Sequence, residues 1–443
     1  MEIKIYNSLT NKVEVFVPIK KGELSIYVCG PTVYNDPHIG NMRPVVFFDT
    51  LCRFFSYVGY NVKFVSNYTD VDDKIINKAL EEKVDEKEIS ERYIARYRNC
   101  LEALNVRKAY ENPRVTEYMP QIISYIDGLV DKGNAYVVDG EVFFNVKSIP
   151  EYGCLSNAKI DDLISGARVI ENDKKNCSLD FLLWKKTEKG IKWDTKWCLG
   201  RPGWHTECCV MIDSIFKGEI DIHGGGMDLK FPHHENEVAQ ALAMHNNKIA
   251  HYWMHNAMMN INGDKMSKSL GNVISAQKAI EEYEPDTVRL FLLNAPYRSI
   301  INLNDTTIQN TKTILQKIDF CYKQLNLQVA VNNGALQGIS TKIHGFLEAL
   351  ADDINVPNAI TFLLEEIKKA NVELRKPDIN LKEISSYFYE LNDMVNILGL
   401  HYSPKAFTKV DISLYNEYTL AKKNKDFVKS DELRKELIAK NII

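Results

Sequence analysis

Residues 24–41 read LSIYVCGPTVYNDPHIGN, and this stretch decides the fold. Residues 24–28 are mostly apolar and indicate a buried strand. After a turn, we expect a helix from about Asn41 to Tyr57, with Pro44 tolerated in its first turn. A helix that begins directly after a buried strand presents free backbone N–H groups and the positive end of its dipole to phosphate. The stretch therefore predicts a phosphate-binding α/β unit.

The following residues extend this unit to strand, helix and strand. The next strand is expected at Val62–Ser66, and a polar segment follows it. Two strands joined by a crossover helix form a parallel βαβ unit, whose ligands lie beyond the carboxyl ends of the strands. Cys29, His38 and Thr69 all fall at that edge.

A second motif supports nucleotide chemistry. Residues 265–269 read Lys-Met-Ser-Lys-Ser, between Gly263 and Gly271. Lysines on such a loop can close over a triphosphate and stabilise the negative charge that develops during phosphoryl or adenylyl transfer. Taken singly, a His before a Gly is usually a turn and a Lys-Ser loop is usually solvated surface. The ordered pair of motifs resembles the two signatures of class I aminoacyl-tRNA synthetases.

Composition agrees with this interpretation. The 443 residues are 45% hydrophobic and 26% charged, which is ordinary for a globular protein of two or three domains. No run of eighteen apolar residues and no leader-like start is present, so we expect no membrane partner. Nine scattered cysteines favour the reducing cytoplasm. With a net charge of −4, any RNA must be bound by local basic surfaces.

The pattern of elements predicts an α/β fold. We expect a Rossmann-type doubly wound parallel sheet with an inserted α+β subdomain and a C-terminal α-helical bundle. In the insertion, short strands are expected at Tyr136–Val146, Arg168–Glu171 and Trp184–Trp197. The doubly wound pattern then resumes with a strand at Glu219–His223, a turn at Gly224–Gly226, a helix at Pro232–His245 and a strand at Trp253–Met259.

These elements give six expected regions. They are the first half of the catalytic Rossmann domain (1–106), an inserted connective subdomain (107–199), the second half of the catalytic domain (200–260), the lysine loop with a stem-contact region (261–305), a helical anticodon-binding bundle (306–401) and a short C-terminal helical extension (402–443).

Histidines are concentrated in one part of the chain. Seven of the ten lie between His205 and His255. His233 and Glu237 are four residues apart on an expected helix, so both side chains leave one face. With Cys208 and Cys29 they form a sulfur, nitrogen and oxygen donor set that suits Zn²⁺. The alternative is that the cysteines are small buried residues and the histidine is merely hydrogen-bonded, and no CxxC pair supports zinc.

Four strings resemble those of cysteinyl-tRNA synthetases. They are Cys29-Gly30-Pro31-Thr32-Val33-Tyr34, Gly203-Trp204-His205-Thr206-Glu207-Cys208, His223-Gly224-Gly225-Gly226 and Phe231-Pro232-His233-His234-Glu235-Asn236-Glu237. The resemblance runs from Ile3 to about Leu400, with the motifs in the family's order. It implies that Cys29, Cys208, His233 and Glu237 hold one zinc ion per chain.

The resemblance also implies roles for other residues. His38 and Asn41 would face the ATP phosphates, with Gly40 under the adenosine and Asn41 in place of the second His of the usual signature. Lys265 and Lys268 would stabilise the departing pyrophosphate. Gly226 and Asp228 would lie near the ribose and base, and Thr69, Trp204 and His205 would line the cysteine pocket. Other readings stay open, because Trp204 can be core, Thr69 a helix cap and Asp228 a turn former.

The implied reaction joins L-cysteine to tRNA(Cys), with ATP and Mg²⁺ as the activating pair. Zinc binds a thiolate far better than a hydroxyl, so serine would be rejected without an editing domain. Lysines after Thr306 could contact tRNA phosphates, although a Lys-rich helix is more often a solvated face. The family usually continues past the position of Ile443 into a short terminal hairpin, so either the protein is naturally short or its anticodon reading is weaker or differently built. Two alternatives remain, a cysteine–amino sugar ligase of thiol biosynthesis and a nonenzymatic RNA-binding paralogue.

Overall fold

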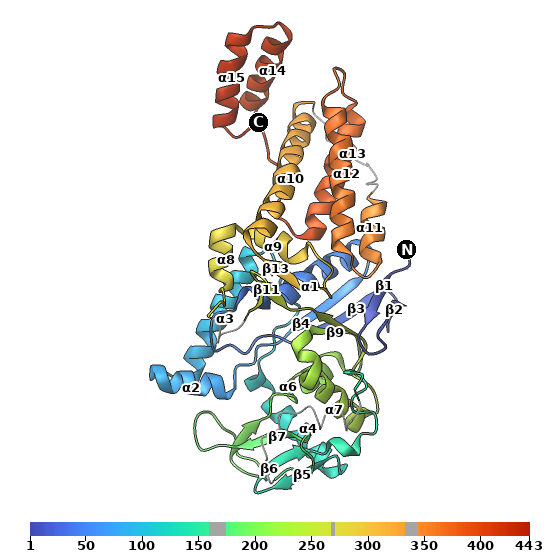
Figure 1. Ribbon diagram of the computed structural model, residues 1–443, viewed down its shortest axis with the longest axis vertical. Helices are drawn as coiled ribbons and strands as arrows, with labels where there is room; N and C mark the ends of the chain where they lie inside the picture. Colours follow the sequence, from blue (N-terminus) through green and yellow to red (C-terminus); the bar gives the residue numbers. More distant parts are fainter. Residues whose placement is uncertain (159–173, 267–270, 333–342) are drawn as a thin grey trace. The chain divides into compact units, whose positions relative to one another are not determined.

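The computed structural model describes residues 1–158, 174–266, 271–332 and 343–443. The chain divides into two compact units. One contains Glu2–Glu282 and Tyr297–Asn302, and the other contains Tyr283–Pro296 and Leu303–Ile443. Figure 1 shows a sheet-containing unit and a helical unit, and each is described here by itself.

A four-stranded parallel sheet forms the centre of the first unit, with strand order β4-β3-β9-β10. Its strands are β3 (Glu23–Val28), β4 (Asn61–Ser66), β9 (Ile220–Gly226) and β10 (Ala250–Asn256). α1 (Ile39–Tyr57) connects β3 to β4, and α7 (Glu235–His245) lies between β9 and β10. The chain therefore winds outward in both directions from the β3–β9 pair, which is a topological switch point where α/β sheets bind ligands.

The predicted βαβ unit is confirmed. β3 is exposed at its first residue and buried on both faces from Ile26 to Val28, and α1 buries most of its residues. His38 caps α1, and the helix begins at Ile39, two residues before the predicted start. Gly59, with φ of 98°, follows the helix end in a backbone conformation that glycine adopts without strain.

The inserted part is also confirmed, as an antiparallel sheet of order β5-β6-β7-β8. Its strands are β5 (Ala135–Val138), β6 (Glu141–Phe144), β7 (Phe181–Lys186) and β8 (Gly200–Pro202). The expected strand over Trp184–Trp197 is confirmed only over Trp184–Lys186, which belong to β7. Beyond Lys186 it is wrong, because only an isolated bridge joins Trp193 to Gly200. The expected strand at Arg168–Glu171 lies outside the described residues.

Further elements surround these sheets. They are β1 (Lys4–Asn7), β2 (Lys12–Val15), α2 (Asp73–Glu82), α3 (Glu86–Ala103), α4 (Met119–Asp131), α6 (Glu207–Phe216), β11 (Met259–Ile261), β12 (Asp264–Lys265), α8 (Ala276–Tyr283) and β13 (Ile301–Leu303). Asp73, at the start of α2, pairs with Lys185 and Arg201 and so fastens α2 to the inserted sheet.

The expected turn at Gly224–Gly226 is wrong, because all three glycines continue β9. Gly224 pairs with both Val28 and Met254 in the sheet. A Cβ at Gly224 would lie 2.0 Å from the Phe48 ring of α1, so the glycine allows the helix to pack closely on the sheet. The predicted helix at Pro232 also begins later: Lys230–His234 form an irregular, kinked segment in which Phe231 is extended, with φ of −140° and ψ of 133°, and α7 begins at Glu235.

The second unit is helical, as predicted. It contains α9 (Pro285–Leu293), α10 (Asp305–Val331), α11 (His344–Ala351), α12 (Val356–Leu374), α13 (Leu381–Leu398), α14 (Lys409–Lys423) and α15 (Phe427–Ala439). Ile318, Cys321 and Leu325 of the predicted apolar stripe are buried. Leu437 and Ile442 pack with Leu327 of α10 and so attach the α14–α15 hairpin to that helix. Among the described residues, no helix is long and apolar enough to cross a membrane.

Candidate active site

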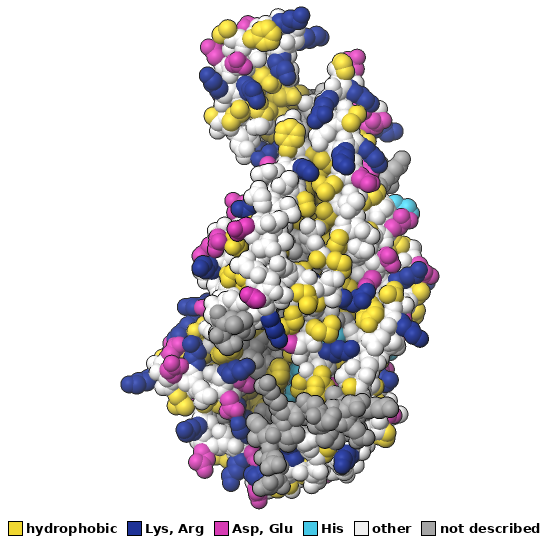
Figure 2. All heavy atoms as spheres, in the orientation of Figure 1, with side chains coloured by type: hydrophobic (Ala, Val, Ile, Leu, Met, Phe, Trp, Pro, Cys, Tyr) yellow, Lys and Arg dark blue, Asp and Glu magenta, His cyan; other side chains and the backbone are white. Residues whose placement is uncertain are grey.

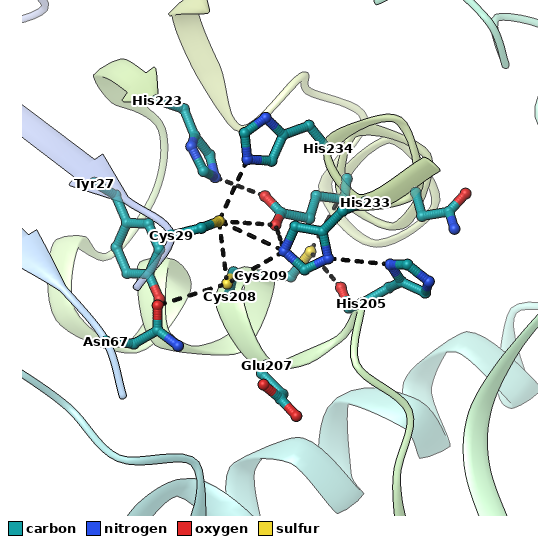
Figure 3. A network of polar contacts seen from close by, with 12 residues as sticks. Tyr27, Cys29, Asn67, His205, Glu207, Cys208, Cys209, His223, His233 and His234 are labelled. Carbon is teal, nitrogen blue, oxygen red and sulfur yellow. Dashed lines mark hydrogen bonds and ion pairs between the residues drawn. The ribbon is translucent and has the colours of Figure 1, made fainter. Parts of the chain in front are cut away.

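The four predicted metal ligands meet at the carboxyl edge of the parallel sheet (Figure 3). Cys29 follows β3, and Cys208 lies in the first turn of α6. His233 lies in the kinked segment just before α7, and Glu237 lies in the first turn of α7. The donor atoms of all four lie within 4.8 Å of one another. Cys208, His233 and Glu237 are buried, whereas Cys29 is partly exposed.

The distances between donor atoms fit a tetrahedral ion. Sγ of Cys29 lies 3.5 Å from Sγ of Cys208 and 3.5 Å from Nε2 of His233, and Cys208 Sγ lies 3.8 Å from the same Nε2. Bonds of ~2.3 Å to sulfur and ~2.0 Å to nitrogen imply tetrahedral edges of ~3.8 Å between sulfurs and ~3.5 Å between sulfur and nitrogen. Glu237 Oε1 lies closer to His233 Nε2, at 2.8 Å. The donor set and the spacing around the two sulfurs fit Zn²⁺, whereas Glu237 would move slightly away from His233 to bind the same ion.

The electrostatics of the cluster favour a cation. Burial alone would raise the pKa of Glu237, but His223 and His233 hold it well below its usual range. The hydrogen bond with Cys29 lowers the pKa of Cys208 to about 6, against the effect of burial. Burial and the neighbouring Cys208 raise the pKa of Cys29. A carboxylate and a thiolate are thus held together in a nearly dry site, where a divalent cation neutralises them.

Further histidines surround the four donors. His223 Nε2 lies 2.6 Å from Glu237 Oε2, and His205 Nδ1 lies 3.1 Å from His233 Nδ1. Burial lowers the pKa of His205 to about 3, with His233 adding to the effect, so His205 is a neutral imidazole. Metal-binding histidines commonly donate their second ring N–H to such a partner, which fixes the ring.

The expected cysteine-pocket residues lie beside this cluster. The Trp204 ring stacks on His233 with a centroid distance of 4.3 Å, and 41% of Trp204 is exposed. Thr69 is buried and donates a hydrogen bond of 3.0 Å to Glu207. Asn67 connects Thr69 to the cluster, because its amide donates to Thr69 Oγ1 at 3.2 Å and its Oδ1 lies 4.0 Å from Cys208 Sγ.

The two expected nucleotide motifs also come together. His38 and Asn41 form a reciprocal capping box at the start of α1. The segment after the lysine motif lies alongside, because Ile39 N–H donates to Ile274 O at 3.0 Å. A Cβ at Gly40 would lie 2.8 Å from the terminal methyl of Met266, so Met266 of the lysine motif lies next to this glycine and its side chain would have to shift to admit a bulkier residue.

The remaining expected residues lie in three places. Gly226 ends β9, and a Cβ there would lie 2.3 Å from Asp228 Oδ1, so this pair is also close. Lys265 is exposed at the end of β12. Lys268 lies outside the described residues.

Comparison with known proteins follows this geometry. Residues 15–313 match the family of tRNA synthetases class I (C) catalytic domains, and residues 345–402 match the DALR domain. A cysteine–tRNA ligase of Listeria monocytogenes serotype 4a (strain HCC23) is 41% identical over 458 residues, which cover 100% of this chain and 97% of the relative. The chain belongs to the cysteine–tRNA ligase family. A second member of the cysteine–tRNA ligase family, from Shouchella clausii (strain KSM-K16), is 42% identical over 451 residues, with the same coverage.

Solved structures confirm the class I fold for this member of the cysteine–tRNA ligase family. Mycobacterium tuberculosis methionyl-tRNA synthetase in complex with methionyl-adenylate matches with a TM-score of 0.61 at 14% identity, covering 85% of this chain and 89% of that one. Thermus thermophilus arginyl-tRNA synthetase matches with a TM-score of 0.54 at 11% identity, covering 90% and 85%. At these identities the likeness concerns the fold alone.

The structure adds site residues that the sequence did not single out. They are Ser8, Asn67, Glu207, His223, His234 and His255. The density of histidines between His205 and His255 was the available signal. It could not separate the buried ones around the cluster from His245 and His251, which lie in surface ion pairs.

Proposed function

We propose that the chain activates L-cysteine with ATP and transfers the cysteinyl group to the 3′ end of tRNA(Cys). In the first step the cysteine carboxylate attacks the α-phosphorus of ATP, the bond to the β-phosphate oxygen breaks, and pyrophosphate leaves. In the second step a hydroxyl of the terminal ribose of tRNA attacks the carbonyl carbon, and AMP leaves. The Cys29, Cys208, His233 and Glu237 cluster, in a chain of the cysteine–tRNA ligase family, carries this proposal.

These four residues would hold one Zn²⁺ per chain. When bound, the ion supplies a soft Lewis acid that prefers a thiolate to a hydroxyl, which separates cysteine from serine. The protein's own residues set the conditions for this preference. His205 would orient the His233 ring, and the packing of Trp204 on His233 would limit the entry of water.

Binding of the rest of the cysteine is assigned to Thr69, Trp204 and His205. Thr69 Oγ1 donates to Glu207 and accepts from Asn67, so it retains one lone pair that could accept from the ammonium group of the amino acid while the thiol lies at the cluster. The buried Glu207 holds the Thr69 side chain in one rotamer through its hydrogen bond. We expect this set to act on cysteine binding more than on ATP binding.

ATP would be bound at the N-terminus of α1. His38 and Asn41 would face its phosphates, Gly40 would leave room for the adenosine, and Mg²⁺ would accompany the triphosphate. Gly226 and Asp228 would lie near the ribose and base. Lys265 and Lys268 would place positive charge where the pyrophosphate departs, so their contribution would be larger in the transition state than in the ground state.

The helical unit is assigned to tRNA. α14, α15 and the turn between them carry the exposed residues Lys422, Lys423, Lys425, Lys429, Arg434 and Lys435. Figure 2 shows basic side chains on this hairpin together with exposed apolar ones. Basic groups mixed with accessible apolar side chains suit phosphates and unstacked bases of a single-stranded loop.

A two-part assay tests the proposal. Purified protein should exchange pyrophosphate into ATP only when cysteine is present, and it should then charge a tRNA with a GCA anticodon. Exchange without charging, combined with ligation of cysteine to an amino sugar, would favour the thiol-biosynthesis ligase. Binding of tRNA without exchange would favour the nonenzymatic paralogue.

A further inference from the structure

A buried chain of polar contacts leads away from the candidate metal cluster. His234 Nε2 lies 3.3 Å from Cys29 Sγ, on the side of the sulfur away from Cys208 (Figure 3). His234 Nδ1 lies 2.8 Å from His255 Nε2, and His255 Nδ1 lies 2.8 Å from Ser8 Oγ. His234, His255 and Ser8 are 0%, 1% and 3% exposed, so solvent does not compete for these contacts.

Regular structure holds each member in place. Ser8 directly follows β1, and its backbone N–H donates to Trp253 O at 2.8 Å. His255 lies on β10, two residues after Trp253, so both side chains are on one face of the sheet. The Trp253 ring lies 5.2 Å from the His234 ring, between centroids. The reaction proposed above uses none of Ser8, His234 and His255.

We propose that Ser8, His255 and His234 form a hydrogen-bond relay of fixed direction that ends on the Cys29 sulfur. In this relay His234 is a donor to a thiolate ligand and is not itself a ligand. The proposal rests on the proposed zinc site, and it assigns positioning roles to three residues outside the four donors.

The direction of hydrogen-bond donation along the relay follows from its last acceptor, the Cys29 sulfur. A metal-bound thiolate has no proton and can only accept, so His234 Nε2 must carry the hydrogen. Across 2.8 Å only one of two imidazole nitrogens can be protonated, so a bare Nδ1 on His234 requires an N–H at His255 Nε2. His255 Nδ1 is then bare, and the Ser8 hydroxyl donates to it.

A second set of possible metal donors gives a competing prediction for the same histidines. The atoms of Cys29, His223, His234 and Glu237 also lie within 4.8 Å of one another, and this set could hold a metal without Cys208. A metal there would need a bare His234 Nε2, which places the hydrogen on Nδ1. The relay would then run the opposite way, towards Ser8. The two placements therefore predict opposite tautomers for the same two histidines.

The relay affects how Cys29 binds a metal. A hydrogen bond to a thiolate ligand withdraws some of the negative charge that the sulfur offers to the ion. An ion that receives less charge from its protein ligands retains more capacity for an incoming substrate thiolate. The same N–H occupies His234 Nε2, so His234 cannot complete a closed coordination shell that would exclude the substrate.

Nitrogen NMR of histidine-labelled, zinc-loaded protein tests the direction. Both His234 and His255 should be neutral with the hydrogen on Nε2, and substitution of each residue by glutamine assigns its signals. Hydrogen on Nδ1 of both residues, with His234 Nε2 in the range of a metal-bound nitrogen, would overturn the proposal and place the metal in the second set.

Zinc-affinity measurements on a series of variants test the contribution of Ser8, the member of the relay farthest from the metal cluster. Ser8→Ala leaves the buried His255 Nδ1 without a donor, so the two rings lose their fixed orientation and His234 no longer holds the Cys29 sulfur in place. This loss should outweigh the extra charge left on the sulfur, so zinc binding should weaken by about 10-fold in chelator competition, as loss of outer-shell partners does elsewhere. Ser8→Thr keeps the hydroxyl and should restore most of the affinity. Ser25→Ala is the matched control, because Ser25 lies on β3 before Cys29 but its hydroxyl bonds only to Asp221 among the described contacts.

The outcomes are distinct. Equal zinc affinity in Ser8→Ala and Ser25→Ala, in a wild-type background that binds one zinc, would overturn the relay and leave the proposed function intact. A wild-type protein that binds no zinc would overturn the zinc part of the proposed function, and the relay with it.

Discussion

The Sγ atoms of Cys29 and Cys208 lie 3.5 Å apart, although the two residues are 179 positions apart in the sequence. Cys29 follows the central strand β3, and Cys208 lies in the first turn of α6. Both residues lie at the carboxyl edge of the parallel sheet. This edge is where a doubly wound sheet gathers residues from distant segments. The inserted antiparallel sheet lies between the two residues in the sequence and accounts for part of their separation. The two thiols nevertheless lie together at this edge of the parallel sheet.

The first prediction concerns these two thiols. Purified protein should contain about one equivalent of zinc, and the double variant Cys29→Ser, Cys208→Ser should contain almost none, because two of four tetrahedral donors are replaced by poor ones. Elemental analysis measures both. Cys209→Ser is the control: Cys209 is buried next to Cys208, but its sulfur contacts the backbone oxygens of His205 and Glu237. Zinc retained in the double variant would refute the site.

The second prediction concerns His205. His205→Phe removes the nitrogen that lies 3.1 Å from His233 Nδ1, while keeping a ring of similar width. We expect zinc affinity to fall by about 10- to 100-fold, because the ligand ring loses its orienting partner. His245→Phe is a matched change at a surface ion pair and should leave the affinity unchanged. Competition with a metal chelator measures both variants, and equal affinities would show that His205 does not orient His233.

The third prediction separates two roles of His38. Its side chain caps α1, so His38→Ala should lower stability by about 1 kcal/mol as well as slowing adenylate formation. Asparagine is a good N-cap residue, so His38→Asn should keep the melting temperature and still lose the imidazole. If His38 acts on ATP, His38→Asn should have a kcat for pyrophosphate exchange at least about 10-fold lower. Full activity in His38→Asn would leave only the capping role.

Local patterns predicted the elements of this fold better than they predicted the contacts between them. The β3–α1–β4 unit follows from a short apolar run, a helix start and a glycine at the helix end, all within about forty residues. The glycines after His223 misled the same reasoning. Gly224 is small because Phe48 packs against it, and that neighbour is remote in the sequence.

The candidate site was predictable only in part. The residues alone grouped the four donors as one of two open readings, and the resemblance then favoured the metal, because no short spacing connects Cys29 to Glu237. The roles of Ser8 and His255 depend on which ring nitrogen faces which atom, and residue identity does not carry that information. Asn67 and Glu207 were likewise ordinary polar residues until the fold placed Thr69 between them.

The fourth prediction concerns Lys268, which is assigned to charge that develops in the transition state. Lys268→Ala should lower kcat for adenylate formation by roughly 10²-fold, while the dissociation constant of ATP changes much less. Lys278→Ala, on the exposed surface of α8, removes the same charge and should have little effect. Single-turnover kinetics and ATP binding measure the two quantities. An unchanged rate with weaker ATP binding would show that Lys268 binds ground state and transition state equally.

The last prediction concerns the α14–α15 hairpin. Cutting the chain near Pro404 should spare cysteine activation and weaken tRNA charging, but the cut also uncovers Leu327, which packs with Leu437 and Ile442. Charge variants avoid this difficulty. The triple change Lys422→Gln, Lys423→Gln, Lys429→Gln removes three exposed charges and keeps the apolar contacts.

We expect this triple variant to keep wild-type pyrophosphate exchange and to have a higher KM for tRNA. The slope of log affinity against log salt should become shallower by about 2, since each phosphate contact to single-stranded nucleic acid contributes about 0.7. The control replaces the exposed Lys12, Lys20 and Lys21 by glutamine. This variant changes the net charge equally, near the N-terminus and far in sequence from the hairpin, and so controls for a general charge effect. The same salt slope in both triple variants would show that the hairpin does not bind tRNA. The two variants change the net charge equally, so only specific phosphate contacts could make their slopes differ.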